Sequence, residues 1–313
     1  MSAKLANIIW MSVVRSILEY GCEVWGDRSL EDFESLQVEM GKRILRCSSR
    51  TNSAVVRGEL GWETVKARRD EMRLRYWAKL TKMGPERMAR KVYDLGRTKL
   101  LSSLERGEAP EPGWCVYTRS LLIELGLEEV WSSGVVPASW LGTVREKIHE
   151  REEKAWRQEV EESSKLRTYR HLHEVLEPAP YLECYYRLGL IELVKLRGGT
   201  NRLRIEQGRY YGLEASQRTC QVCSSSTVED ESHFVLDCPA YEILRSEMWV
   251  SLTPLTGKSR AAYEGQEKIT TLAELIGDIA SKGATRVVMK FIVRAMGVRK
   301  KILREKGLLW ERK

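Results

Sequence analysis

The sequence lacks the motifs on which the catalytic sites of common enzyme classes depend. It has no pair of adjacent aspartates, no G-x-S-x-G nucleophile turn, no Walker phosphate-binding loop and no H-E-x-x-H motif. Among the histidines, His171 and His173 are separated by one residue, so on a helix they point apart, and His149 stands alone. The sequence therefore predicts a protein without enzymatic activity.

Long apolar runs are also absent. No stretch approaches the ~20 apolar residues of a membrane span, and residues 1–10 show no cleavage pattern of a signal peptide. We therefore expect a chain of the cytoplasm, the nucleus or both, without a membrane partner. The seven cysteines would stay reduced there, and clustered Cys and His then favour a metal over a disulfide.

Phenylalanine is scarce, with three residues, so ten tryptophans together with tyrosine and leucine must fill the interior. Apolar residues recur at helical spacing along most of the chain, whereas the pattern of strands is nearly missing. The sequence predicts a mainly α, multi-helical fold. Helices are expected over about 64–83 and, in an acidic segment, over about 138–176. A small knuckle of the CCHC type is expected between helices.

Four residues form the most specific motif of the sequence. Their spacing is C-x2-C-x9-H-x4-C, and they are Cys220, Cys223, His233 and Cys238. Three thiolates and one imidazole complete a tetrahedral ligand set for Zn²⁺ with no open position, so the predicted zinc site is structural. The spacer of nine residues is long enough for a turn and the start of a helix that carries His233. Because so small a segment has almost no core, the metal should contribute on the order of 10 kcal/mol to its folding.

The net charge of +8 is unevenly distributed along the chain. Residues 41–106 hold 18 basic and 7 acidic side chains, 284–313 hold 10 and 2, and 107–164 hold 6 and 12. The two basic blocks predict a polyanionic partner, RNA or DNA, bound through its phosphate backbone. The acidic segment 107–164 could instead meet a basic protein partner.

Candidate residues for nucleic-acid binding lie on the helix expected over 64–83 and just before the cysteines. Trp77 or Tyr76 could stack on a base, although Tyr76 lies on the apolar face and is expected to be buried. The alternative is that the aromatic residues belong to the core and the cations are only solvated. The candidate phosphate contacts are Lys66, Arg68, Arg69, Arg73, Arg75, Lys79, Arg197, Arg202, Arg204 and Arg209.

Several short stretches together carry a resemblance to a known family. Residues 20–25 read Y-G-C-E-V-W, and the helix expected after them ends in K-R-I-L at 42–45. Nearer the cysteines, 196–203 read L-R-G-G-T-N-R-L, 229–234 read E-D-E-S-H-F and 238–241 read C-P-A-Y. The first group resembles the segment after the polymerase core of LINE-type (non-LTR) retrotransposon reverse transcriptases, and the second resembles their zinc-binding tail. The resemblance covers roughly 5–85 and 185–250.

The resemblance implies a thumb and a zinc-binding tail without the polymerase that precedes them in the family. The family's Y-x-D-D polymerase site has no counterpart in this sequence, and only the four Cys and His residues inherit a role, as metal ligands. We expect a non-catalytic nucleic-acid-binding fragment of a retrotransposon reverse transcriptase polyprotein, truncated or degenerate. The alternative is a zinc-braced helical scaffold for protein interactions that has no nucleic-acid function.

The same observations divide the sequence into four segments. Residues 1–105 would form a thumb-like helical region and 106–184 an acidic helical spacer. Residues 185–250 would form the zinc-binding domain, and 251–313 would form basic C-terminal helices.

Overall fold

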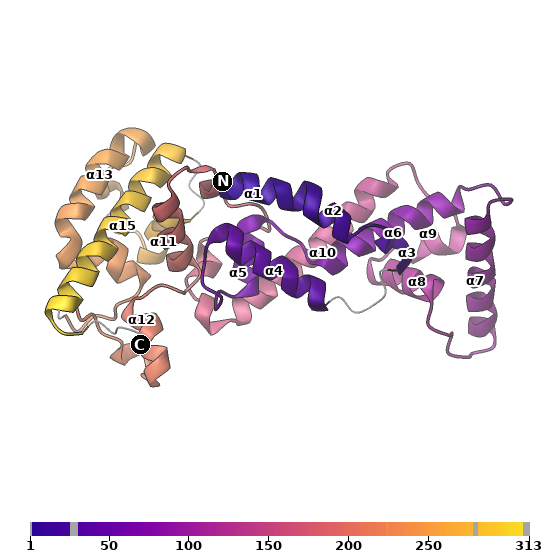
Figure 1. Ribbon diagram of the computed structural model, residues 1–313, viewed down its shortest axis with the longest axis horizontal. Coiled ribbons are helices and arrows are strands. Elements are labelled where there is room, and N and C mark those ends of the chain that lie inside the picture. The colour runs from indigo at the N-terminus through magenta and orange to yellow at the C-terminus, as the bar shows by residue number, and fades with distance from the viewer. Residues whose placement is uncertain (1, 26–30, 224, 278–280, 309–313) are drawn as a thin grey trace. The chain divides into compact units, whose positions relative to one another are not determined.

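The structure is a computed structural model that describes residues 2–25, 31–223, 225–277 and 281–308 (Figure 1). These residues form helices and turns, and no β-strand occurs among them. An isolated antiparallel bridge joins Thr219 to Val228. The prediction of a mainly α fold with a small Cys/His segment between helices is confirmed.

The α-helices are α1 (Ala3–Ile9), α2 (Arg15–Leu18), α3 (Cys22–Trp25), α4 (Glu31–Leu45), α5 (Ser53–Leu60), α6 (Val65–Thr81), α7 (Met88–Glu105), α8 (Trp114–Glu124), α9 (Glu128–Ser133), α10 (Trp140–Glu162), α11 (Arg187–Arg197), α12 (Arg204–Gln207), α13 (Glu242–Thr256), α14 (Lys268–Ile276) and α15 (Lys282–Glu305). The π-helical turns are η1 (Trp10–Val14) and η7 (His233–Asp237). The 3₁₀ turns are η2 (Ser164–Leu166), η3 (Tyr169–His171), η4 (Pro180–Glu183), η5 (Gly208–Tyr211), η6 (Ala215–Gln217), η8 (Pro239–Tyr241) and η9 (Arg260–Tyr263).

The chain folds into two compact units, and each is discontinuous in sequence. The first unit contains residues 1–9, 38–62 and 156–313, and the second contains 10–37 and 63–155. The four continuous segments expected from the sequence are a different kind of division and stay a prediction.

The first unit packs helices that lie far apart in the sequence. Its three longest C-terminal helices associate, with α15 (yellow in Figure 1) against both α11 (red-brown) and α13 (orange). A second cluster forms where Trp156 of α10 packs on α5 and donates a hydrogen bond from Nε1 to the carbonyl of Ala54 at 2.8 Å. The Asn52 side chain caps α5 by accepting from the Ala54 amide. The metal-ligand motif belongs to this unit.

The acidic helix is shorter than the sequence predicts. α10 ends at Glu162, whereas the apolar pattern suggested helix to about 176. The chain continues in the 3₁₀ turns η2 and η3, where Leu166, Tyr169 and Leu172 are buried at intervals of three residues. These residues lie in or directly after two separate turns, but their spacing also matches the i, i+3 pattern of an α-helix. The tertiary packing of these side chains therefore decides the conformation.

Trp77 is a core residue of the second unit and does not form a stacking platform. It is 0% exposed, and its ring lies 5.9 Å from that of Trp131 and 5.3 Å from that of Trp140. Its Nε1 donates to the hydroxyl of Tyr93 at 3.1 Å. Tyr76, expected to be buried, is half-buried and packs edge-on against a neighbouring tryptophan. Trp77, rather than Tyr76, therefore lies on the side of α6 that enters the core.

We expect Trp77→Ala to destabilise the second unit by about 3–5 kcal/mol, because it removes a large buried ring and leaves a cavity. Urea unfolding measures the loss. The exposed aromatic Tyr20 provides the control, and Tyr20→Ala should change the unfolding free energy by about 0.5 kcal/mol or less. An unchanged urea midpoint together with a loss of nucleic-acid affinity would show instead that Trp77 contacts the ligand.

Candidate metal centre and nucleic-acid interface

The four residues of the C-x2-C-x9-H-x4-C motif converge in the structure. Their ligand atoms, three Sγ atoms and an imidazole nitrogen, all lie within 4.8 Å of one another. Cys223 Sγ is 3.5 Å from His233 Nε2. A tetrahedral zinc ion, with Zn–S about 2.3 Å and Zn–N about 2.0 Å, would hold a sulfur and a nitrogen about 3.5 Å apart. The cluster is therefore close enough to hold a metal ion.

Hydrogen bonds among the four candidate ligand groups also shift their pKa values. A hydrogen bond with Cys238 lowers the pKa of the Cys220 thiol to about 3, and the same contact raises the pKa of the Cys238 thiol. A hydrogen bond with Cys220 raises the pKa of His233 to about 9. A divalent cation that binds these four groups displaces the protons that they still carry, because it is ligated by thiolates and a neutral imidazole.

Local hydrogen bonds shape residues 220–238, which carry the four candidate ligands and which we call the metal loop. The Cys220 amide donates to the carbonyl of Thr227 at 2.8 Å and closes the first turn. Asp230 Oδ1 accepts from the His233 amide at 2.8 Å, just where η7 begins. His233 thus starts a helical turn, as the length of the spacer predicts. The Cys238 amide returns to the His233 carbonyl at 2.7 Å, which brings the last ligand back to the cluster.

Glu229 ties the metal loop to the C-terminal helix and to the segment that precedes the cysteines. Its carboxylate accepts from Arg299 Nε at 2.7 Å and from a second guanidinium nitrogen at 2.9 Å. The Arg204 amide donates to the same carboxylate at 2.7 Å. Both Glu229 and Arg299 are buried. A bidentate pair of this kind fixes the relative position of two elements as well as their charges.

Glu231, the other carboxylate of the E-D-E motif, is also buried. It accepts hydrogen bonds from Arg167 at 2.6 Å, Thr168 at 3.0 Å and Asn201 at 3.0 Å. Its three donors come from two segments that precede the metal loop by tens of residues in the sequence. Through its two glutamates, the motif 229–234 therefore attaches the metal loop both to α15 and to segments that precede the loop in the sequence.

Arg245 completes the support of the metal loop. It is 1% exposed, and it donates from Nε to the carbonyl of Val235 at 2.8 Å and from a terminal nitrogen to that of Cys238 at 2.9 Å. Sequence reasoning did not identify Arg245 or Arg299 as site residues. The two glutamates of the E-D-E motif are a signal that basic partners exist, but the sequence does not show which arginines they are.

Two of the arginines predicted to contact phosphate on α6 are buried, and the prediction is wrong for them. Arg69 is 2% exposed, and its guanidinium lies over the rings of both Trp25 and Phe33, 4.6 and 4.8 Å from their centroids. Arg73 is 6% exposed. A guanidinium held in the interior by aromatic rings is not available to a phosphate. Charge alone in the sequence does not distinguish such a residue from a solvated one.

Arg197 is likewise buried, so it too is removed from the predicted phosphate contacts. Its Nε lies 2.7 Å from Glu59 Oε1, and both side chains are 0% exposed. A terminal nitrogen donates to the carbonyl of Ile276 at 2.7 Å. The arginine therefore cross-links α11, α5 and α14 within the first unit, and its charge is neutralised there.

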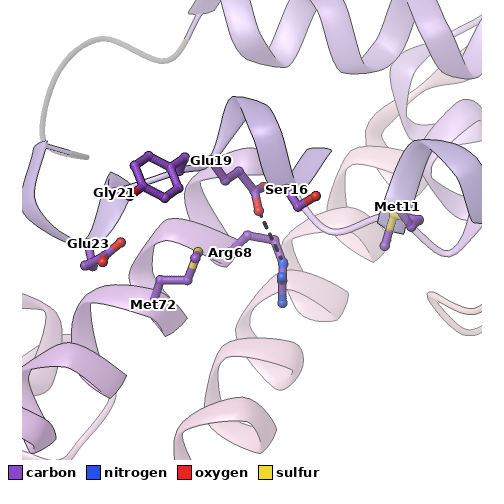
Figure 2. Close-up of a pocket in the computed structure, with 8 residues that line it drawn as sticks. Met11, Ser16, Glu19, Gly21, Glu23, Arg68 and Met72 are labelled. Carbon is purple, nitrogen blue, oxygen red and sulfur yellow. Dashed lines mark ion pairs between the residues drawn. The ribbon is translucent and has the colours of Figure 1, made fainter. Parts of the chain in front are cut away.

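Arg68 lines a cavity of about 350 Å³ in the second unit, which Figure 2 shows together with its acidic lining. Its Nε is 3.8 Å from Glu19 Oε2, and a terminal nitrogen donates to Glu71 Oε2 at 3.1 Å. Glu23 adds a further carboxyl group to the lining. Because acidic groups surround Arg68, this cavity does not suit a phosphate.

The remaining candidates stay predictions and fall into two groups. Lys66, Arg75 and Lys79 are exposed on α6 in the second unit. Arg202 is exposed, and Arg204 and Arg209 are half-buried, in the unit that holds the metal-ligand motif.

Family models, curated proteins and solved structures give no match to the chain. The similarity to LINE-type reverse transcriptases therefore depends on the short stretches that carry it, and the absence of an enzymatic activity stays a prediction. None of the described helices is both long and apolar enough to cross a membrane.

Proposed function

We propose that the protein binds RNA or DNA without transforming it, and that a structural zinc ion stabilises the unit that makes the contact. The observation that carries this proposal is the attachment of a basic segment to the metal loop. The Ile205 amide donates to the Glu229 carbonyl at 3.0 Å, and the adjacent Arg204 amide donates to the Glu229 carboxylate. Arg202, Arg204 and Arg209 are therefore held on a backbone that the metal loop supports.

Zinc is the metal that the ligand chemistry favours. Three sulfur ligands and an imidazole form a soft donor set, which suits zinc rather than magnesium or calcium. The set is closed, since four protein ligands fill a tetrahedron, and a closed site leaves no position for a substrate. The proposed role of the ion is therefore to hold the loop and not to take part in a reaction.

We further propose that the chain corresponds to the thumb and zinc-binding tail of a LINE-type reverse transcriptase. Support comes from the motifs at 20–25, 42–45, 196–203, 229–234 and 238–241. The E-D-E part of the tail motif has a structural reason in this chain, because its residues bind partners on both sides of the metal loop. A protein with this function would meet its ligand in the cytoplasm or the nucleus.

The alternative, a scaffold whose acidic segment meets a basic protein, has less support from the structure. The exposed surface of α10 is not acidic throughout. Glu146 and Glu150 alternate with the exposed cations Arg145, Lys147 and Lys154. A basic partner would therefore encounter both signs of charge along this helix, and the electrostatic attraction would be weak.

A salt titration of nucleic-acid affinity tests the proposed function. Each phosphate that a cation contacts releases condensed counterions, so three contacts should weaken binding roughly 20- to 40-fold between 50 and 200 mM salt. Filter binding with single-stranded RNA and DNA measures this effect. Arg202→Gln should reduce the slope of log K against log salt by about 0.7–0.9. The control Arg260→Gln, at an exposed arginine that pairs with Glu242 outside both basic blocks, should leave the slope unchanged. An affinity that does not weaken with salt contradicts the proposal.

A further inference from the structure

Two adjacent tyrosines of the first unit are exposed beside the basic segment. Tyr210 is 70% exposed and Tyr211 is 53% exposed. They end the 3₁₀ turn η5, and Gly212 follows with a φ of 66°, in the left-handed region that glycine adopts readily. The turn therefore exposes two aromatic side chains at the surface.

An arginine lies over each of the two rings. The Cζ atom of Arg50 is 5.4 Å from the ring centroid of Tyr210, and that of Arg204 is 5.4 Å from the ring centroid of Tyr211. A planar guanidinium over an aromatic face is a cation–π contact, and the same geometry suits a stacked nucleobase. Since Tyr210 stays 70% exposed with Arg50 in place, most of its side chain remains in contact with solvent.

Two further cations, Lys165 and Arg209, lie near Arg50 and the turn η5. The Lys165 ammonium donates to the Arg50 carbonyl at 2.9 Å, and Arg209 donates to the Ser164 carbonyl at 2.9 Å. Burial lowers the pKa of the Lys165 ammonium. The positive charge of Arg209 lowers this pKa further, whereas the negative charge of Glu206 raises it. The buried Glu206 carboxylate pairs with Arg167 at 2.9 Å and lies 3.5 Å from Arg209 Nε, so this one acidic group is shared by two cations.

The metal loop supports this surface through Arg218, which lies just before the first cysteine ligand. Arg218 donates to the Leu213 carbonyl at 2.9 and 2.6 Å and to the Ile205 carbonyl at 2.8 Å. The turn that carries the tyrosines lies between those two carbonyls in the sequence. Gly208 packs so closely on Arg218 that a Cβ atom there would be 2.5 Å from the arginine side chain. Arg218 thus fixes the turn on its buried side, while the two tyrosines stay exposed to solvent.

We propose that this part of the first unit, which we name the tyrosine surface, binds single-stranded nucleic acid. It consists of Arg50, Lys165, Arg204, Arg209, Tyr210 and Tyr211. Bases stack on the two tyrosines, and the cations contact the phosphates on either side. The inference rests on the proposed function and adds the class of ligand: a duplex conceals the faces of its bases inside its own stack, whereas a single strand exposes them.

Tyrosine substitutions in the full-length chain test this inference. The double variant Tyr210→Ala/Tyr211→Ala should bind fluorescent oligothymidylate and oligouridylate dodecamers roughly 10-fold or more weakly at fixed salt, because it removes the stacking partners. Tyr210→Phe/Tyr211→Phe keeps the rings and should bind within about 2-fold of wild type. Tyr185→Ala, at a tyrosine of the same unit that is 84% exposed, should have no effect. Fluorescence anisotropy gives the affinities, and an equal metal content of all variants verifies that the loop is folded.

The outcomes separate the inference from the proposed function. If wild type binds the single strands and the alanine double variant binds them equally well, the inference is overturned while the proposed function stands. If wild type binds a duplex as tightly as a single strand, and the alanine substitutions weaken both equally, base stacking is excluded and the inference is overturned as well. If wild type binds neither RNA nor DNA, the proposed function itself fails.

Discussion

Replacing Cys238 with serine is expected to abolish metal binding and to unfold the loop that carries the four ligands. Cys238 is 0% exposed, and its backbone carbonyl is held by Arg245. The ligated segment has little core of its own, and structural zinc contributes on the order of 10 kcal/mol to the folding of such segments. Phe234 in the loop packs 6.3 Å from Phe291 of α15, so part of the loss should extend to the rest of the first unit.

The metal content of purified protein and limited proteolysis measure this effect. The variant should hold less than about a tenth of a zinc equivalent and should be cleaved near the loop, and a chelator should produce the same cleavage in wild type. Cys47→Ser is the matched control, because Cys47 is half-buried in the same unit and lies outside the ligand cluster. Full zinc content in Cys238→Ser, with unchanged proteolysis, would exclude the cluster as the metal site.

Replacing Arg299 with methionine is expected to destabilise the protein by about 3–5 kcal/mol, since it leaves the buried Glu229 carboxylate without its cation. The Glu229 carboxylate would then keep the hydrogen bond from the Arg204 amide. The free energy of unfolding from urea or guanidinium titration measures the loss. The unfolding should be concentrated in the first unit, where both residues lie.

The same helix offers a control for this substitution. Arg294 of α15 pairs with Glu247, but both side chains are more than half exposed. Arg294→Met should therefore cost about 0.2–1 kcal/mol. The double variant Glu229→Gln/Arg299→Met should recover part of the loss, because no unpaired charge stays buried. Equal, small losses for Arg294→Met and Arg299→Met would mean that the Glu229–Arg299 pair does not hold the metal loop in place.

The metal cluster was predictable because its information is local. Four ligands within 19 residues, at spacings that a turn and a helical start can bridge, define the cluster almost independently of the remaining fold. The helical class was predictable for a similar reason, since the apolar period of a helix is visible within a few turns. After Glu162, the spacing of the apolar residues fits both an α-helix and a 3₁₀ turn, so the local pattern did not decide between these two conformations.

Whether an individual arginine is buried or exposed was not predictable, since it depends on residues far away in the sequence. Arg197 meets Glu59 across 138 positions, and Arg299 meets Glu229 across 70. A local count of charge treats these arginines and the exposed Arg202 alike. The buried arginines differ from Arg202 because neighbouring helices remove water from their guanidinium groups. This free-energy cost of desolvation arises only once the chain is folded.

The sequence by itself therefore determined the helical class, the four candidate metal ligands and the excess of positive charge. The tertiary structure decided which cations remain at the surface, which glutamates and arginines fix the metal loop, and where exposed tyrosines meet the remaining cations. The physical reason is the range of the interactions. Ligand spacing and helical period act over a few residues, whereas burial and ion pairing depend on packing between distant segments.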